Sequence, residues 1–230
     1  MRIIGLLGGM SWESTATYYR LLNLAVKQRL GGLHSARIIL YSVDFDEVER
    51  LQRAADWDTA GALLAGAATA LQAAGAECIL IGANTMHKVA PAVEAAVRIP
   101  VLHVVDATAA PIRTAGMSVV GLLGTRFVME QDFYIDRLHD RHALRVLTPG
   151  RADRDIIHRI IFEELVVGKL LQASRGEFRR IMAALVAEGA QGVILGCTEF
   201  SLLVQAEDCA VPLFDSTSLH ARMATDWSLS

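Results

Sequence analysis

Short apolar runs alternate along this chain with longer stretches in which apolar residues recur at helical spacing. The runs are rich in Val, Ile and Leu and end in Gly, Asn, Asp or Thr, so they predict β-strands that lead into loops. The predicted strands are 3–7, 36–42, 78–81, 101–105, 118–123, 143–147, 193–195 and 212–214. Because helical segments separate these strands, the pattern favours βαβ units and parallel sheets.

The stretches between the strands predict helices, several of them rich in alanine. These helices are 14–30, 59–74, 88–96, 108–115, 131–138, 154–167, 175–188 and 217–229. The apolar runs are broken well short of the roughly 18 residues that a membrane-spanning helix needs. The opening residues, 1–9, are too short and glycine-rich for a signal peptide. We therefore expect a soluble, cytoplasmic protein.

The chain also contains an internal repeat. Residues 75–85 and 189–199 are nearly copies of each other and place Ala83 opposite Cys197, a separation of 197 − 83 = 114 residues. Two further pairs of segments repeat in the same order, at separations of 121 − 5 = 116 and 211 − 99 = 112 residues. Three matches in order indicate the duplication of a whole domain.

The repeat predicts an α/β fold of two pseudosymmetric domains, each a four-stranded, mostly parallel sheet flanked by helices. Domains commonly have about 100–150 residues, so 230 residues accommodate two. We place the N-terminal domain at 1–115 and the C-terminal domain at 116–216, with the last helix, 217–230, as a candidate to complete the first domain. The carboxyl ends of the strands of both domains are expected to line one cleft.

Composition and charge exclude several classes of function. The hydrophobic content of 53% supplies two cores, while the net charge of −3 and the lack of a basic stripe argue against nucleic acid or a membrane surface as a partner. Arg175, Arg179 and Arg180 are expected to form a solvated helix face. Three cysteines are too few for a disulfide framework, and no metal site is expected. We assign Cys78 to the core and Cys209 to a loop.

The turn after the 193–195 strand carries the candidate catalytic group. Cys197 precedes a helical segment there, and the positive end of a helix would lower the pKa of the thiol and populate the thiolate. Glu199 either points toward substrate or partner groups or helps to draw the proton off the thiol. Ala83, in the twin turn, offers only a methyl group. The repeat therefore predicts a one-sided acid/base site.

Four turns could bind an anion such as a carboxylate through small polar side chains and backbone N–H groups. The candidate binding residues are Met10, Ser11, Asn84, Thr85, Thr125, Thr198 and Glu199. For Thr125 a helix N-cap before residues 127–130 is the alternative role. His87 could orient neighbouring groups, relay a proton or serve the structure alone.

Taken together, these turns resemble the aspartate/glutamate racemase family. The motifs that carry the resemblance are residues 8–14, 83–87, 124–127, 196–199 and 212–217. Family members are cofactor-independent, pair two pseudosymmetric α/β domains, commonly form homodimers and invert an amino acid at Cα with two cysteines on opposite faces. The resemblance implies that Cys197 is the second of these cysteines. It also implies that the substrate carboxylate is bound by Asn84, Thr85, Thr125 and Thr198.

The first cysteine of the family falls at Ala83, which can neither take nor give a proton. An α-proton of an amino acid is very weakly acidic, so its removal requires a base together with donors that stabilise the developing enediolate. Inversion then needs a proton from the opposite face. We therefore expect binding of a small amino or carboxylic acid, with weak or one-sided racemase activity and no cofactor.

Two other functions stay open at this point. A single cysteine could protonate the enediolate that decarboxylation of a malonate-type acid leaves behind. A small-acid binding protein is the non-enzymatic alternative, although a pure binder needs no thiol. An acidic substrate would also require a cation for its side-chain carboxylate, and the candidates are Arg50, Arg126 and Lys169.

Overall fold

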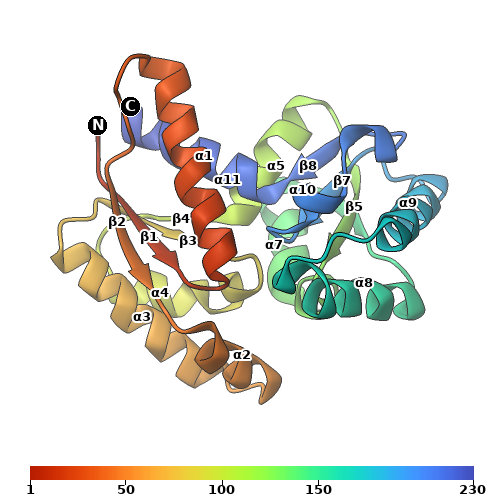
Figure 1. Cartoon of the computed structure of the whole chain (residues 1–230), viewed down its shortest axis with the longest axis horizontal. Helices are drawn as coiled ribbons and strands as arrows, with labels where there is room; N and C mark the ends of the chain where they lie inside the picture. Colours follow the sequence, from red (N-terminus) through yellow and green to blue (C-terminus); the bar gives the residue numbers. More distant parts are fainter. The chain divides into compact units, whose positions relative to one another are not determined.

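The computed structural model describes residues 1–230, and these form two compact units (Figure 1). Unit 1 comprises Met1–Val104 together with Thr217–Ser230, and unit 2 comprises Val105–Ser216. The predicted boundary at residues 115/116 lies one helix later, because α5 (Val104–Thr114) groups almost entirely with unit 2.

The sheet of unit 1 has the strand order β2-β1-β3-β4, and every pair is parallel. Its strands are β1 (Ile4–Gly8), β2 (Ile38–Ser42), β3 (Cys78–Ile81) and β4 (Val101–Leu102). The two central strands, β1 and β3, are buried along their whole length. A parallel strand covered on both faces requires an unbroken apolar run, which is the pattern that the sequence shows there.

Helices cover both faces of this sheet. They are α1 (Trp12–Leu30), α2 (Phe45–Arg53), α3 (Trp57–Ala73), the 3₁₀ helix η1 (Thr85–Val89), α4 (Ala90–Ala96) and α11 (Ser216–Leu229). Successive residues of β1 point to opposite faces. Leu6 accordingly packs with Tyr18 of α1 and Ala224 of α11, whereas Leu7 packs with Leu64 of α3.

Unit 2 repeats the same architecture with the strand order β6-β5-β7-β8, again entirely parallel. Its strands are β5 (Val119–Gly124), β6 (Arg145–Leu147), β7 (Val193–Gly196) and β8 (Leu213–Asp215). Its further helices are α6 (Arg126–Glu130), α7 (Asp132–His142), α8 (Arg151–Glu163), η2 (Leu165–Val167), α9 (Gln172–Ala187), α10 (Phe200–Leu203) and η3 (Ala206–Asp208). The predicted pair of four-stranded sheets is thereby confirmed.

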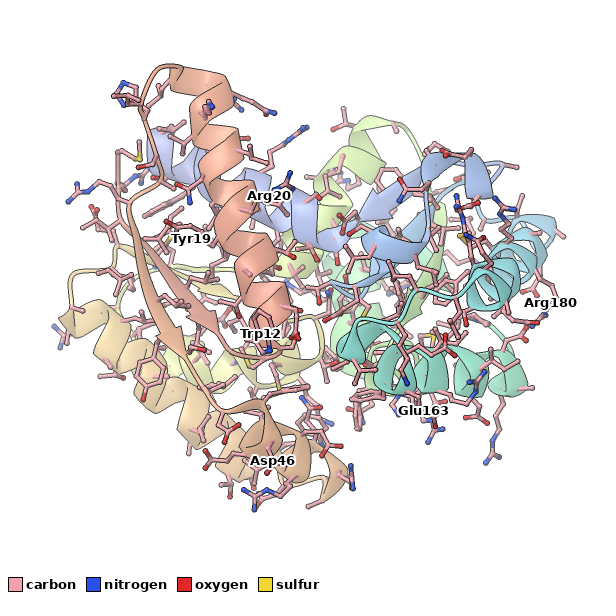
Figure 2. The ribbon with its side chains drawn as sticks, viewed as in Figure 1. Trp12, Tyr19, Arg20, Asp46, Glu163 and Arg180 are labelled. Carbon is pink, nitrogen blue, oxygen red and sulfur yellow. The ribbon has the colours of Figure 1, made fainter.

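The sequence did not predict helix α2. Only Val48 and Gln52 of this helix are buried, so its apolar spacing is too sparse to reveal it. Asp44 caps the helix by accepting a hydrogen bond from the Asp46 N–H at 3.2 Å, and Asp46 itself lies on the outer surface of the helix (Figure 2). None of the helices combines the length and the apolar character needed to cross a membrane.

Candidate active site

Strand β7 ends in a glycine that the sheet requires. Gly196 pairs with Gly124 of β5, and a Cβ atom at position 196 would lie 2.8 Å from the carbonyl oxygen of Leu123. The carbonyl of Cys197, the next residue, accepts a hydrogen bond from the Phe200 N–H at 3.2 Å. The strand therefore ends in a tight turn that fixes the backbone of Cys197.

Three side chains of this turn form one hydrogen-bonded group. The Cys197 thiol donates to Glu199 Oε2 at 3.1 Å, and the Thr198 hydroxyl donates to the same oxygen at 2.6 Å. All three residues are buried, but Cys197 keeps 7% of its surface exposed. One carboxylate oxygen thus contacts both the thiol and the hydroxyl.

The thiol of Cys197 is held in its protonated form. Burial and then the neighbouring Glu199 carboxylate raise its pKa well above the usual value for cysteine, while the backbone N–H groups of Glu199 and Thr198 lower it by less. The predicted lowering of this pKa by a helix is wrong. The helix in question, α10, starts only at Phe200 and has four residues, so its dipole is small beside a buried carboxylate.

The twin turn follows β3 in unit 1. Gly82 continues the ladder by donating its N–H to the Leu7 carbonyl at 2.8 Å, and Ala83 comes next with 7% of its surface exposed. Asn84 and Thr85 are likewise almost buried. Ala83 therefore follows Gly82 as Cys197 follows Gly196 in unit 2, with a methyl group in place of the thiol.

The ring of His87 bridges two backbone groups of unit 1. Its Nδ1 lies 2.7 Å from the Ala83 carbonyl oxygen, and the Val104 N–H donates to its Nε2 at 3.1 Å. A carbonyl only accepts and an amide N–H only donates, so Nδ1 carries the hydrogen and Nε2 carries none. Both ring nitrogens thus bind the backbone.

The remaining predicted binding residues lie after the carboxyl ends of β1 in unit 1 and of β5 in unit 2. Thr125 is the N-cap of α6 and accepts from the Val128 N–H at 3.3 Å, so its capping role is confirmed. After β1, Met10 and Ser11 are buried, and Ser11 caps α1. The Gly9 N–H in this loop donates to the Thr15 hydroxyl at 2.7 Å.

Two of the three arginines expected on a solvated face also bind a buried carboxylate. Arg175 donates to Asp208 Oδ2 at 2.7 Å, Arg179 donates to Oδ1, and the Gln205 N–H also donates to Oδ2, at 2.8 Å. Arg179 and Arg180 are exposed as expected, whereas Arg175 is half-buried. Arg180 (Figure 2) pairs with carboxylates of α8 and α9. Asp208 therefore anchors η3, the segment after α10, to α9.

Asp208→Asn is expected to lower the free energy of unfolding at pH 7 by roughly 2 kcal/mol, because Arg175 and Arg179 lose their charged partner. Burial alone would raise the pKa of Asp208, but the hydrogen bonds from Arg175, Gln205 and Arg179 outweigh it and lower the pKa to about 2. The stabilisation is therefore present above the unfolded pKa of about 3.9 and is lost as the pH falls toward 2.

Urea unfolding at a series of pH values tests this prediction. The loss of stability between about pH 4 and pH 2 should be smaller in Asp208→Asn than in the unmodified protein. Asp153→Asn is the matched control, since it removes one of the two carboxylate partners of the exposed Arg180 and should cost less than about 1 kcal/mol. Parallel pH curves for the unmodified protein and Asp208→Asn would contradict the prediction.

Of the candidate cations for a substrate side chain, two are paired. Arg50 lies 3.1 Å from Asp46, and Arg126 lies 2.7 Å from Asp155. Lys169, in the loop between η2 and α9, is exposed and makes no ion pair within 4.0 Å.

No group of three or more His, Cys, Asp or Glu side chains is arranged to hold a metal ion. Cys78 is fully buried as expected, and burial raises the pKa of its thiol to about 12.

The sequence and the fold of this chain are similar to those of known proteins. The family model described as Asp/Glu/Hydantoin racemase matches residues 7–224. A candidate Asp/Glu racemase from Yersinia pestis is 54% identical over 100% of both chains, with a TM-score of 0.95. An aspartate racemase homologue from Pyrococcus horikoshii OT3 is 36% identical over 100% of both chains, with a TM-score of 0.86. An aspartate racemase from Picrophilus torridus, at 19% identity, shares the fold with a TM-score of 0.77 over 98% of this chain and 95% of that one.

Proposed function

This chain belongs to the Asp/Glu/hydantoin racemase family, and from that premise we propose that it is a cofactor-independent racemase-type enzyme that exchanges the α-proton of an amino acid through Cys197. Its racemisation is weak or one-sided, because Ala83 stands where the resemblance implies a second base. The single observation that supports this function most directly is the 3.1 Å hydrogen bond from the Cys197 thiol to Glu199.

The Cys197–Glu199 pair supplies a base in two steps. The thiol proton first passes to Glu199, which becomes a neutral carboxylic acid, and the thiolate is stabilised by the backbone N–H groups of Thr198 and Glu199. The thiolate then removes the α-proton of the substrate. The S–H bond that forms holds the proton while the electrons of the Cα–H bond move into the enediolate, and exchange with solvent occurs before the proton returns.

The enediolate carries its charge on the substrate carboxylate, so donors at that group lower the barrier. We assign this role to Asn84, Thr85, Thr125 and Thr198, the small polar residues of turns at the carboxyl ends of strands. Each of them is buried with a small exposed fraction. Met10 and Ser11, in the loop after β1, complete the proposed binding residues.

We propose an acidic amino acid as the substrate. The support is the 36% identity with an aspartate racemase homologue and the presence of a cation, Lys169, that no carboxylate neutralises. Arg50 and Arg126 fit this role less well because each already pairs with an aspartate. The homodimer that the family resemblance implies stays a prediction.

Deuterium incorporation at Cα tests the proposed function. In heavy water, we expect aspartate or glutamate to exchange faster than neutral amino acids, and one enantiomer of each to exchange much faster than the other. The rate should rise with pH above neutrality, because burial and Glu199 raise the pKa of Cys197 and leave little thiolate at pH 7. NMR of the α-proton signal measures the rate. No exchange across both enantiomers of a panel of amino acids would refute the proposal.

One observation favours a second candidate, the decarboxylation of a malonate-type acid. That reaction needs a proton donor rather than a base, and the raised pKa of Cys197 keeps its thiol protonated. Loss of the C–CO₂ bond would leave an enediolate, which the Cys197 S–H would protonate at carbon. Mass spectrometry on mixtures with substituted malonates separates the two: release of carbon dioxide without any Cα exchange of amino acids would favour the decarboxylase.

A further inference from the structure

A cluster of buried rings lies beside the turn after β3 in unit 1. The centroid of the His87 ring is 4.5 Å from that of His103 and 5.5 Å from that of His220. His220 forms hydrogen bonds with residues of α1 and β4. Its Nε2 donates to the Leu102 carbonyl at 2.6 Å, so its Nδ1 accepts from the Tyr18 hydroxyl at 2.9 Å. Tyr18 and the three histidines are at most 4% exposed. The rings around His87 are therefore fixed in place.

His87 connects this cluster to the peptide bond between Ala83 and Asn84. The Ala83 carbonyl accepts the Nδ1–H hydrogen bond at 2.7 Å, and the bond from Val104 to Nε2 stops the ring from turning over. The peptide bond is trans, since the only cis bond joins Met10 and Ser11. In a trans peptide the C=O and N–H point in opposite directions. The Asn84 N–H is therefore directed away from the buried ring.

Unit 2 lacks this arrangement. The repeat places Ser201 opposite His87, at the same separation of 201 − 87 = 114 residues. In that unit the Cys197 carbonyl accepts from the Phe200 N–H, and the backbone N–H groups of Thr198 and Glu199 act on the Cys197 sulfur. The histidine thus accompanies only the turn that has no sulfur.

We propose that His87 is a positioning residue, which aims the Asn84 backbone N–H at the carboxylate of the bound acid. The proposal rests on the proposed function, since it deepens the role of the same turn. A preset amide stabilises the developing enediolate without reorganisation during the reaction. His87 itself touches neither substrate nor reacting atoms, and acts through the peptide bond that its ring holds.

Selective ¹⁵N-asparagine labelling tests the proposal directly. The chain contains two asparagines, Asn84 and Asn23, so the spectrum shows two backbone signals, and Asn23 on α1 is an internal reference. We expect succinate and L-aspartate to shift the Asn84 signal and leave the Asn23 signal in place. In His87→Phe the shift should disappear, and the dissociation constant for succinate should rise about tenfold.

Two variants separate positioning from loss of stability. Tyr18→Phe removes a hydrogen bond of the same buried cluster without touching the Ala83 carbonyl, and should destabilise the fold while keeping the Asn84 response. His87→Asn keeps a donor near that carbonyl and should restore part of the response, which also covers the case that His87→Phe does not fold.

An unmoved Asn84 signal in the unmodified protein, or an equal shift in His87→Phe, overturns the proposal. Cα exchange measured on the same unmodified sample reports on the racemase chemistry separately. Exchange without an Asn84 response overturns only the role of His87. A response without exchange supports the positioning role and counts against the reaction.

Discussion

Cys197→Ala is expected to lower the rate of Cα deuterium exchange by about a hundredfold to ten-thousandfold, the usual contribution of a positioned acid/base group. The variant leaves the enediolate donors of the turns in place and removes only the atom that carries the proton. It also leaves Glu199 without the thiol that donates to it at 3.1 Å. Exchange rates for both enantiomers of aspartate, followed by NMR in heavy water, measure the loss.

Cys209→Ala is the matched control, because it replaces another free cysteine that lies outside the turn, after η3. It should exchange at the rate of the unmodified protein. Cys197 packs in the core of unit 2, so the melting temperature of each variant must be compared first. A folded Cys197→Ala that still exchanges at the original rate would show that another group is the base.

The architecture of each unit could be predicted from the sequence. Parallel strands buried on both faces need continuous apolar runs, so β1, β3, β5 and β7 are visible as such runs. The internal repeat then gives the equivalence of Ala83 and Cys197, because duplicated segments keep the same order along the chain. These are local or periodic properties, which a single sequence contains.

The electrostatics of the site could not be predicted in the same way. The sequence predicts a low pKa for Cys197 because this residue precedes a helical segment, but the pKa depends on how deeply the thiol is buried and where Glu199 points. Likewise, the bonds from Arg175 to Asp208 and from His220 to Leu102 join residues far apart in the sequence. No periodicity in the sequence marks such contacts. The spacing of Arg175 and Arg179, four residues apart on α9, indicates only that the two arginines share one face of the helix.

Ala83→Cys is expected to raise racemisation of the best substrate by about a hundredfold or more, because it supplies the acid/base group that the opposite face lacks. The backbone at this position is already held, since the Ala83 carbonyl accepts from His87 at 2.7 Å and the Gly82 N–H donates to Leu7 at 2.8 Å. Cysteine also adds only one sulfur atom to the alanine side chain. Polarimetry from each pure enantiomer measures the gain.

The double variant Ala83→Cys/Cys197→Ala makes the prediction specific. With the thiol moved from one turn to its twin, the enantiomer that exchanges fastest at Cα should be the opposite of the one preferred by the unmodified protein. Ala83→Ser is the control, because a hydroxyl of similar size is a far weaker acid and base than a thiol. If the double variant keeps the original preference, positions 83 and 197 do not act on opposite faces of one substrate, and the pseudosymmetry of the two turns has no catalytic meaning.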